Sequence, residues 1–314
     1  MSGAPCPVFH TADFPLPLPA GHPFPAHKYR LLVDRVIAEL GGRVAVQVAP
    51  AVRDEELRLA HDPDYVARVR AGTLRAAEIQ RIGFPWSPEM VERSLRSTGA
   101  TVAAARVALD RGVAVHLGGG THHAFADGGA GYCVFHDVVV AARVVQRERG
   151  VRRILVVDLD VHQGDGTATM TAGDDTVFTF SMHGARNYPR VKQRSDLDVE
   201  LPDGTGDAVF LAELERGLPL AFERSRPELV FYLAGADPFL DDRLGRLALT
   251  KAGLLARDHA VLDAVARAGA ALVVTLAGGY ARRIEDSVDI HCATVAAVVG
   301  SDLARGRDPA AERA

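Results

Sequence analysis

Cysteine is scarce in this sequence, and this scarcity bears on the redox compartment of the protein and on the kinds of site that it can contain. The 314 residues include only Cys6, Cys133 and Cys292, which are widely separated and form no C-x-x-C motif. An odd, sparse set of this kind argues against a disulfide framework and against a zinc site built from thiolates. It is typical of a reducing compartment, and we therefore expect a cytoplasmic protein.

Long apolar runs and a strong charge of one sign are also absent. No run reaches the length of a membrane helix, and the N-terminus lacks the basic start and continuous apolar segment of a secretory signal. The formal net charge of −4 gives no sign of the basic stripe that a nucleic acid would need. What is present, 48% hydrophobic and 24% charged residues, is typical of a soluble protein with a sizeable core.

The pattern of the chain predicts one α/β domain over residues 1–314. An extended N-terminal segment, 1–27, holds seven of the 17 prolines, and a polar tail, 301–314, ends the chain. Between them helical and strand patterns alternate, which predicts three layers, with a mostly parallel sheet between two layers of helices. Residues 72–86 and 184–206 show no regular pattern. We expect helices at 28–40, 54–59, 63–71, 88–111, 136–149, 208–224, 250–268 and 285–299, and strands at 44–48, 113–117, 153–159, 176–182, 229–233 and 271–276.

The most informative stretch runs from Ile154 to Gly166. Its four apolar β-formers predict a central strand covered on both faces. Asp158, Asp160 and His162 then alternate, so an extended chain would project them to one side. Ligands of open α/β sheets bind beyond the carboxyl ends of strands, and an Asp and a His on one face suit a divalent metal. A network of Asp and His hydrogen bonds that caps the strand is an equal alternative at this point.

Three other predicted strands also end in polar groups, namely His122 with His123, then Asp237, then Tyr280. Taken singly, they are readily explained as a satisfied histidine pair, a helix cap and a packing residue. Parallel strands, however, bring their carboxyl ends to the same edge of the sheet. We therefore expect all these groups to converge on the cluster that begins at Asp158.

Convergence would assemble a metal site. Asp160, His162 and Asp237 would supply three nitrogen or oxygen ligands and leave an open position for water and a substrate carbonyl. Two anionic ligands reduce the Lewis acidity of a metal, so a neighbouring general base would help to deprotonate the water.

His122 and His123 can supply that base. A carboxylate behind each ring, such as Asp158 or Asp165, would fix the tautomer and raise the basicity. Tyr280 can donate its phenolic hydrogen to a developing oxyanion, a contact whose loss typically costs roughly 3–4 kcal/mol of barrier. These parts describe metal-assisted hydrolysis of an amide.

Several motifs, in their order and spacing, resemble those of the histone deacetylases. They are GGGTHHA at 118–124, GYC at 131–133, DLDVHQGDG at 158–166, GAD at 235–237 and GGY at 278–280. The similarity runs from about residue 20 to 300. Within the family, HPF at 22–24, the three glycines at 118–120 and DRLG at 242–245 are closer to the class IV branch.

The resemblance implies an arginase–deacetylase fold with a central sheet of about eight strands and a set of site residues. Zinc would be held by Asp160, His162 and Asp237. His123 would be the main general base and acid, His122 its electrostatic partner, and Tyr280 the residue that polarises the carbonyl, while Asp158 would orient His122 and Asp165 would orient His123. The Gly131 carbonyl would meet the substrate amide, and Tyr132, Tyr188 and Leu244 would line an acyl-lysine channel. A structural potassium ion would lie near Asp158, Asp160, His162, Ser181 and the carbonyl of Met182.

Some residues depart from the family pattern. Tyr132 stands where many members place Phe, and Asp165 stands where class IV members usually have Asn. The rim aspartate that grips the substrate backbone in class I enzymes has no clear counterpart in residues 72–86.

The sequence leaves four functions open. The favoured one is zinc-dependent hydrolysis of Nε-acyl-lysine in proteins or peptides, with both acetyl and long-chain fatty acyl groups as candidates. A second is hydrolysis of small acylated amines such as acetylpolyamines. A dinuclear manganese ureohydrolase would need a carboxylate at position 164, where the chain has Gly164. The fourth is a catalytically silent module that binds acyl-lysine.

Overall fold

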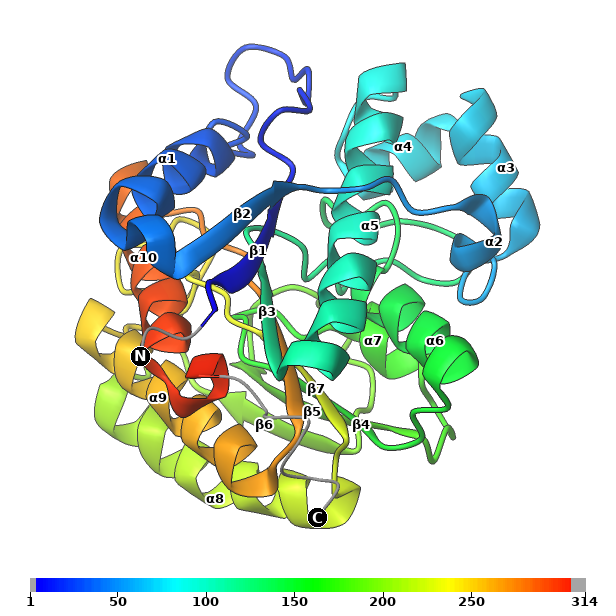
Figure 1. Cartoon of the computed structure of the whole chain (residues 1–314). Helices are drawn as coiled ribbons and strands as arrows, with labels where there is room; N and C mark the ends of the chain where they lie inside the picture. The colour runs from blue at the N-terminus through cyan, green and yellow to red at the C-terminus, as the bar shows by residue number, and fades with distance from the viewer. Residues whose placement is uncertain (1–3, 306–314) are drawn as a thin grey trace.

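The structure is a computed structural model that describes residues 4–305. Its centre is an eight-stranded sheet in the order β2-β1-β3-β8-β7-β4-β5-β6, in which every pairing is parallel (Figure 1). This confirms the predicted sheet. The strands are β1 Cys6–His10, β2 Val44–Val48, β3 Val113–His116, β4 Ile154–Asp158, β5 Val177–Gly184, β6 Leu197–Leu201, β7 Leu229–Leu233 and β8 Ala271–Thr275.

The central strands are apolar on both sides because both faces of the sheet are covered. Along β4, Ile154 and Val156 pack into the core on one face, while Leu155 and Val157 pack into the core on the other. Successive side chains of a strand point to opposite faces, so a strand between two cores must be continuously hydrophobic. The four apolar residues before Asp158 follow one another without a polar residue because each of them faces one of the two cores.

Helices cover the two faces of the sheet in two separate layers (Figure 1). The layer beside one core contains α1 Lys28–Leu40, α8 Asp207–Ser225, α9 Lys251–Ala268 and α10 Ile284–Gly300. The layer beside the other contains α2 Asp54–Leu57, α3 Pro63–Ala71, α4 Ala76–Ile82, α5 Pro88–Arg111 and α6 Asp137–Arg149. A short helix, α7 Asp165–Met170, follows β4. Within residues 4–305, no helix is both long and apolar enough to cross a bilayer.

Most predicted elements agree with the structure to within one or two residues. The start of α5 shows why: Ser87 accepts a hydrogen bond from the backbone N–H of Met90, and Pro88 occupies the first turn. Side-chain capping and an N-terminal proline are local signals that the sequence carries directly.

The N-terminal segment, which is predicted only to be extended, forms β1 between β2 and β3 in the sheet. Two predictions of irregular chain were wrong, and the first concerns residues 184–206, which contain the edge strand β6. Residues 72–86 contain α4, and α7 was not predicted at all. Prolines masked β1, and α4 and α7 are too short for a clear helical period. Of the predicted polar tail, 302–305 form a 3₁₀ turn, and 306–314 lie outside the described residues.

The order of the strands fixes where the functional groups can lie. β3, β8, β7 and β4 are consecutive neighbours in the sheet. These are the four strands whose carboxyl ends lead to His122 and His123, Tyr280, Asp237 and Asp158. The topology therefore brings all four chain segments to one edge of the sheet, as the sequence predicts.

A buried histidine gives a prediction about stability at low pH. His61 is 2% exposed, its Nε2 accepts the backbone N–H of His136, and its Nδ1 lies 3.3 Å from the Ala126 carbonyl oxygen. Burial lowers the pKa of His61 to about 4, against 6.5 in an exposed chain. Between these two values the unfolded chain binds a proton that the folded protein excludes. The free energy of unfolding should therefore fall as pH falls through this window, by up to about 1.4 kcal/mol per pH unit from this residue.

His61→Gln should lessen this loss, because glutamine keeps a hydrogen-bond acceptor and donor but takes up no proton. Urea denaturation at pH 7 and pH 5 measures the difference in the free energy of unfolding. His259→Gln, at an exposed position of α9, is the matched control for replacing a histidine with glutamine. If the free energy of unfolding of His61→Gln depends on pH as strongly as that of the unaltered protein, His61 does not contribute to the loss of stability at low pH.

Candidate active site

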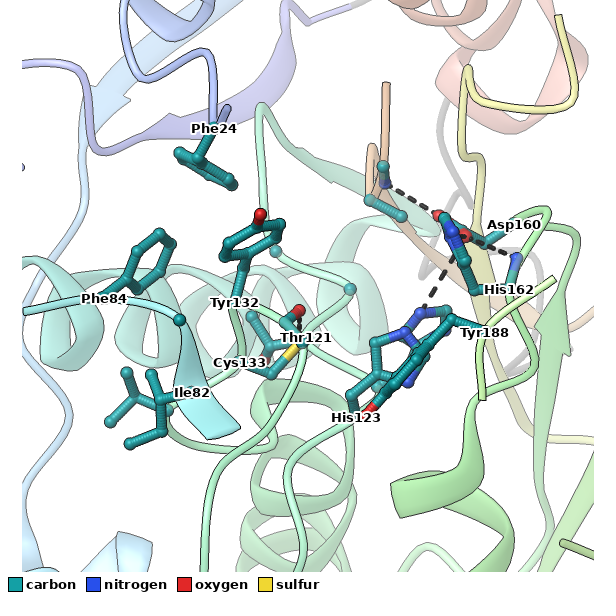
Figure 2. A pocket seen from close by; sticks show the side chains of 18 of the residues that line it. Phe24, Ile82, Phe84, Thr121, His123, Tyr132, Cys133, Asp160, His162 and Tyr188 are labelled. Carbon is teal, nitrogen blue, oxygen red and sulfur yellow. Dashed lines mark hydrogen bonds and ion pairs between the residues drawn. The ribbon is translucent and has the colours of Figure 1, made fainter. Parts of the chain in front are cut away.

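The three predicted metal ligands meet at one point beyond the sheet. Asp160 and His162 follow β4, and Asp237 follows β7. One ligand atom from each lies within 4.8 Å of the others. His162 Nδ1 is 2.9 Å from Asp160 Oδ1 and 3.3 Å from Asp237 Oδ2. Figure 2 shows Asp160 and His162 side by side in the wall of the cavity.

These residues fit a divalent cation. Asp237 Oδ1 accepts the backbone N–H of Val161, whereas Asp237 Oδ2 is buried and accepts no hydrogen bond. The chain closes tightly over this oxygen, because a Cβ at Gly278 would lie only 1.9 Å from it. An orphaned carboxylate oxygen beside a second carboxylate and an imidazole is a suitable set of nitrogen and oxygen ligands.

The protonation of the same residues supports this fit. Burial and the nearby Asp160 raise the pKa of Asp237 to about 7. Burial works against a charged His162, but Asp160 and Asp237 raise its pKa to about 10. Two carboxylates held together away from water thus require positive charge between them. A proton on His162 supplies it in the absence of metal, and a divalent cation can replace that proton.

Two histidines with carboxylates behind them lie next to this cluster. His122 Nδ1 is 2.7 Å from Asp158 Oδ2, and His123 Nδ1 is 2.6 Å from Asp165 Oδ1. The two ring centroids are 4.1 Å apart. Each carboxylate holds a hydrogen on Nδ1 and so determines the state of Nε2. Both predicted His–Asp contacts are present.

The two histidines differ in charge although they are neighbours. Burial opposes a charge on His122, but the Asp158 carboxylate raises its pKa to about 9. Burial and the charge of His122 lower the pKa of His123 to about 4. At neutral pH His122 is therefore cationic and His123 neutral. Such separation of pKa values gives one ring a free lone pair for a proton and the other a fixed positive charge.

Tyr280 leaves β8 and enters the same cavity. Burial raises the pKa of Tyr280 well above its usual value, so the phenol keeps its hydrogen and can donate it. Its backbone N–H donates to Asp242 Oδ2 at 2.6 Å, and its carbonyl oxygen accepts from Arg243 Nε at 3.0 Å. Lys28, buried in α1, donates to the Gly279 carbonyl at 3.1 Å.

Sequence reasoning missed the supporting contacts of Tyr280. In the sequence, Asp242 is part of a family motif and Lys28 is the first residue of a predicted helix, and neither pattern indicates a contact with Gly279 or Tyr280. A carboxylate between two turn segments gives no sign of which backbone N–H groups it will accept. These contacts could be recognised only once the loops after β7 and β8 had been placed together.

The predicted channel residues line the cavity, which has a volume of about 540 Å³. Figure 2 shows Phe24, Phe84 and Tyr132 on one side of it and His123, His162 and Tyr188 on the other. The Tyr188 ring meets His123 edge-on at 4.7 Å. The other residues assigned to substrate, Gly131, Tyr132 and Leu244, also belong to the lining.

The turn that carries Gly131 and Tyr132 is conformationally demanding. Gly131 has φ 52° and Tyr132 has φ 67°, and a Cβ at position 131 would lie 2.7 Å from the ring of His123. Only glycine fits at position 131 without displacing His123. A tyrosine with positive φ is uncommon, and such strain is concentrated at functional sites.

The stretch 72–86 contributes to the cavity, although its one tryptophan, Trp86, is not part of the lining. The lining includes Gly83 and Phe84. Trp86 instead donates to the Val69 carbonyl and packs against Gly72. The one carboxylate in this stretch, Glu78, is bound by Arg68 and Arg75. The stretch contains no aspartate.

The residues assigned to potassium are also neighbours. Asp158 lies directly opposite Ser181 in the β4–β5 ladder, and Ser181 Oγ is 2.9 Å from His183 Nδ1. Asp160, His162 and Met182 lie on the adjoining segments of chain. The presence of a potassium ion stays a prediction.

Comparison with solved structures identifies the fold. A crystal structure of an HDAC homolog complexed with SAHA superposes with a TM-score of 0.81 at 24% identity and covers 95% of this chain and 85% of that one. The HDA15 HD domain superposes with a TM-score of 0.78 at 21% identity and covers 96% and 92%. The class is that of the arginase–deacetylase α/β fold.

Sequence comparison then defines the family. A histone deacetylase domain model matches residues 22–295. The chain is 45% identical to an uncharacterised protein of Picosynechococcus over 91% of this chain and 95% of that protein. It is 31% identical to a histone deacetylase-like amidohydrolase of Pseudomonas aeruginosa over 84% and 74%. The chain belongs to the histone deacetylase family and is a hydrolase of that family.

Asp242→Asn tests the support of Tyr280. Besides Tyr280, the carboxylate accepts the backbone N–H groups of Leu244 and Gly245. An amide would turn a donor toward one of these N–H groups and displace the loop. We expect the kcat of a hydrolysis assay to fall about 10- to 100-fold through lost oxyanion donation, while the bound-metal content stays unchanged. Asp241→Asn, which alters only a surface pair with Arg282, is the control. A loss of activity explained wholly by lost metal would contradict this role.

Proposed function

We propose that the protein hydrolyses the amide bond of Nε-acyl-lysine in proteins or peptides and that it does so with bound zinc. One observation carries the proposal: the three candidate ligands, the neutral and charged histidines and the phenol of Tyr280 all line a single cavity. The polarisable carbonyl of an amide and the water that attacks it both need such groups at close range.

Asp160, His162 and Asp237 would hold the zinc ion, which when bound supplies Lewis acidity toward the water and the substrate carbonyl. A potassium ion near Asp158 and Ser181 is part of the same proposal.

His123 acts as the general base that takes a proton from the attacking water, with Asp165 holding its ring in place. His122, kept cationic by Asp158, stabilises the negative charge that develops nearby. Tyr280 donates its hydrogen to the carbonyl oxygen as the carbon becomes tetrahedral. His123 then returns the proton to the lysine amine as the C–N bond breaks.

Substrate would reach this point through the channel of Tyr132, Tyr188 and Leu244, where the Gly131 carbonyl accepts the substrate N–H. The volume of about 540 Å³ exceeds what an acetyl group fills, so long-chain fatty acyl groups stay within the proposal. We also propose a place in the class IV branch, from the motifs at 22–24 and 242–245, and a cytoplasmic location.

An acetylpolyamine hydrolase is the second candidate, because the chain is 32% identical to a human polyamine deacetylase over 79% of this chain and 40% of that protein. A dinuclear ureohydrolase is disfavoured by structure as well as sequence. A Cβ at Gly164 would already lie 2.7 Å from Asp158 Oδ2, which leaves no room for a further carboxylate.

Two substitutions test the proposed roles. Tyr280→Phe removes only the phenolic oxygen and should lower kcat about 100- to 1,000-fold on an acetyl-lysine peptide. His123→Ala should lower it about 100- to 10,000-fold. Both variants should keep the zinc content and thermal unfolding midpoint of the unaltered protein. Activity that persists in both would refute the mechanism.

The substrate class is tested with lysine peptides that carry acetyl through myristoyl groups, beside N-acetylpolyamines, with and without a metal chelator. We expect cleavage of the peptides, loss of cleavage with chelator and recovery with zinc. Faster cleavage of polyamines would favour the second candidate, and no cleavage with no bound metal would favour a silent acyl-lysine-binding module.

A further inference from the structure

The charges that line the cavity are unbalanced. Among the described residues of the lining, the carboxylates are Asp160 and Asp237, both within the candidate metal cluster. The arginines of the lining outnumber these carboxylates; they are Arg81, Arg93, Arg186 and Arg246. The protein as a whole carries a formal charge of −4, so this excess of positive charge is local to the cavity.

Arg186 and Arg246 form one side of the opening and share a single anion. Their guanidinium groups lie 3.6 Å and 3.2 Å from the same oxygen of Asp203, and their side chains are 75% and 52% exposed. Asn187 Nδ2 donates to the Leu244 carbonyl at 2.8 Å and ties the two loops together. Two cations against one carboxylate leave net positive charge beside the channel residues Tyr188 and Leu244.

Arg81 belongs to the opposite wall. Its backbone carbonyl accepts the N–H of Gly131, and its guanidinium donates to the carbonyl of Gly129. Within residues 4–305 it forms no ion pair with a carboxylate. Arg81 therefore adds an unneutralised cation next to the turn that bears Tyr132.

The acidic residues nearest in sequence to this opening are already engaged. Asp242 is buried and accepts three backbone N–H groups. Asp241 is paired with Arg282 at 3.1 Å. Arg243, between Asp242 and Leu244, donates to the carbonyls of Tyr280 and Pro23 and has no carboxylate partner in the described part of the chain.

We propose that Arg81, Arg186 and Arg246 select acyl-lysines that stand in acidic segments of a protein, with Asp or Glu near the modified lysine. This inference rests on the proposed function. A cationic opening attracts and orients carboxylates, and it repels a polyamine chain or a lysine-rich tail. The attraction operates between exposed groups, so salt weakens it.

The test uses three acetyl-lysine peptides of equal length whose flanking residues are acidic, neutral or basic. Their kcat/KM values are measured with the unaltered protein at low and high salt. Binding of the same peptides to Tyr280→Phe, which is expected to turn over slowly, is followed by fluorescence anisotropy. We expect the acidic peptide to be favoured about tenfold or more over the basic one at low salt, with the difference shrinking at high salt.

Charge reversal identifies the residues responsible. Arg186→Glu and Arg246→Glu should each reduce or invert the preference, and Arg81→Glu should do so from the other wall. Arg216→Glu makes the same change of charge on α8, where the side chain is 73% exposed and outside the cavity lining, and should leave the preference unchanged.

The outcomes separate this inference from the proposed function. Cleavage of all three peptides at equal kcat/KM, unaltered by reversal at Arg186 or Arg246, would overturn the inference and leave the function standing. Charge-selective binding without any cleavage would support the inference and overturn the function. Neither selective binding nor cleavage would overturn both.

Discussion

The structure depends on holding two carboxylates and an imidazole together at a point removed from water. Asp160 and Asp237 cannot both be ionised there without a compensating positive charge, which is why the pKa of His162 is raised to about 10 and that of Asp237 to about 7. Neighbouring parallel strands, β4 and β7, make the encounter possible because their carboxyl ends are adjacent. The remaining groups are arranged around this concentration of charge.

The surrounding groups acquire distinct properties from small differences of environment. Asp158 keeps His122 cationic, and that cation together with burial keeps His123 neutral, so two adjacent histidines differ in charge at neutral pH. Tyr280 is protonated, and backbone contacts with Asp242 and Arg243 fix its position. The same protein thus presents a base, a fixed cation and a hydrogen-bond donor to one cavity.

Much of this arrangement was predictable from sequence because its signals are local or topological. Alternation of Asp158, Asp160 and His162 after an apolar strand is local, and the parallel sheet makes convergence with Asp237 and Tyr280 a consequence of topology. What could not be predicted depends on distant segments meeting: β1 pairs with β2 and β3, and Asp242 accepts the backbone N–H of Tyr280. The strand β6 was not predicted, although its sequence LDVEL alternates apolar and acidic residues with the period of two that is typical of a strand.

The most direct test of the central claim is a calorimetric titration of the metal-free protein with Zn²⁺, repeated in two buffers of different ionisation enthalpy. The account predicts one tight site and release of about one to two protons near neutral pH, because the ion displaces the proton of His162 and the fraction of a proton on Asp237. It also predicts loss of that site in Asp237→Ala. No tight binding, or equal binding by Asp237→Ala, would contradict it.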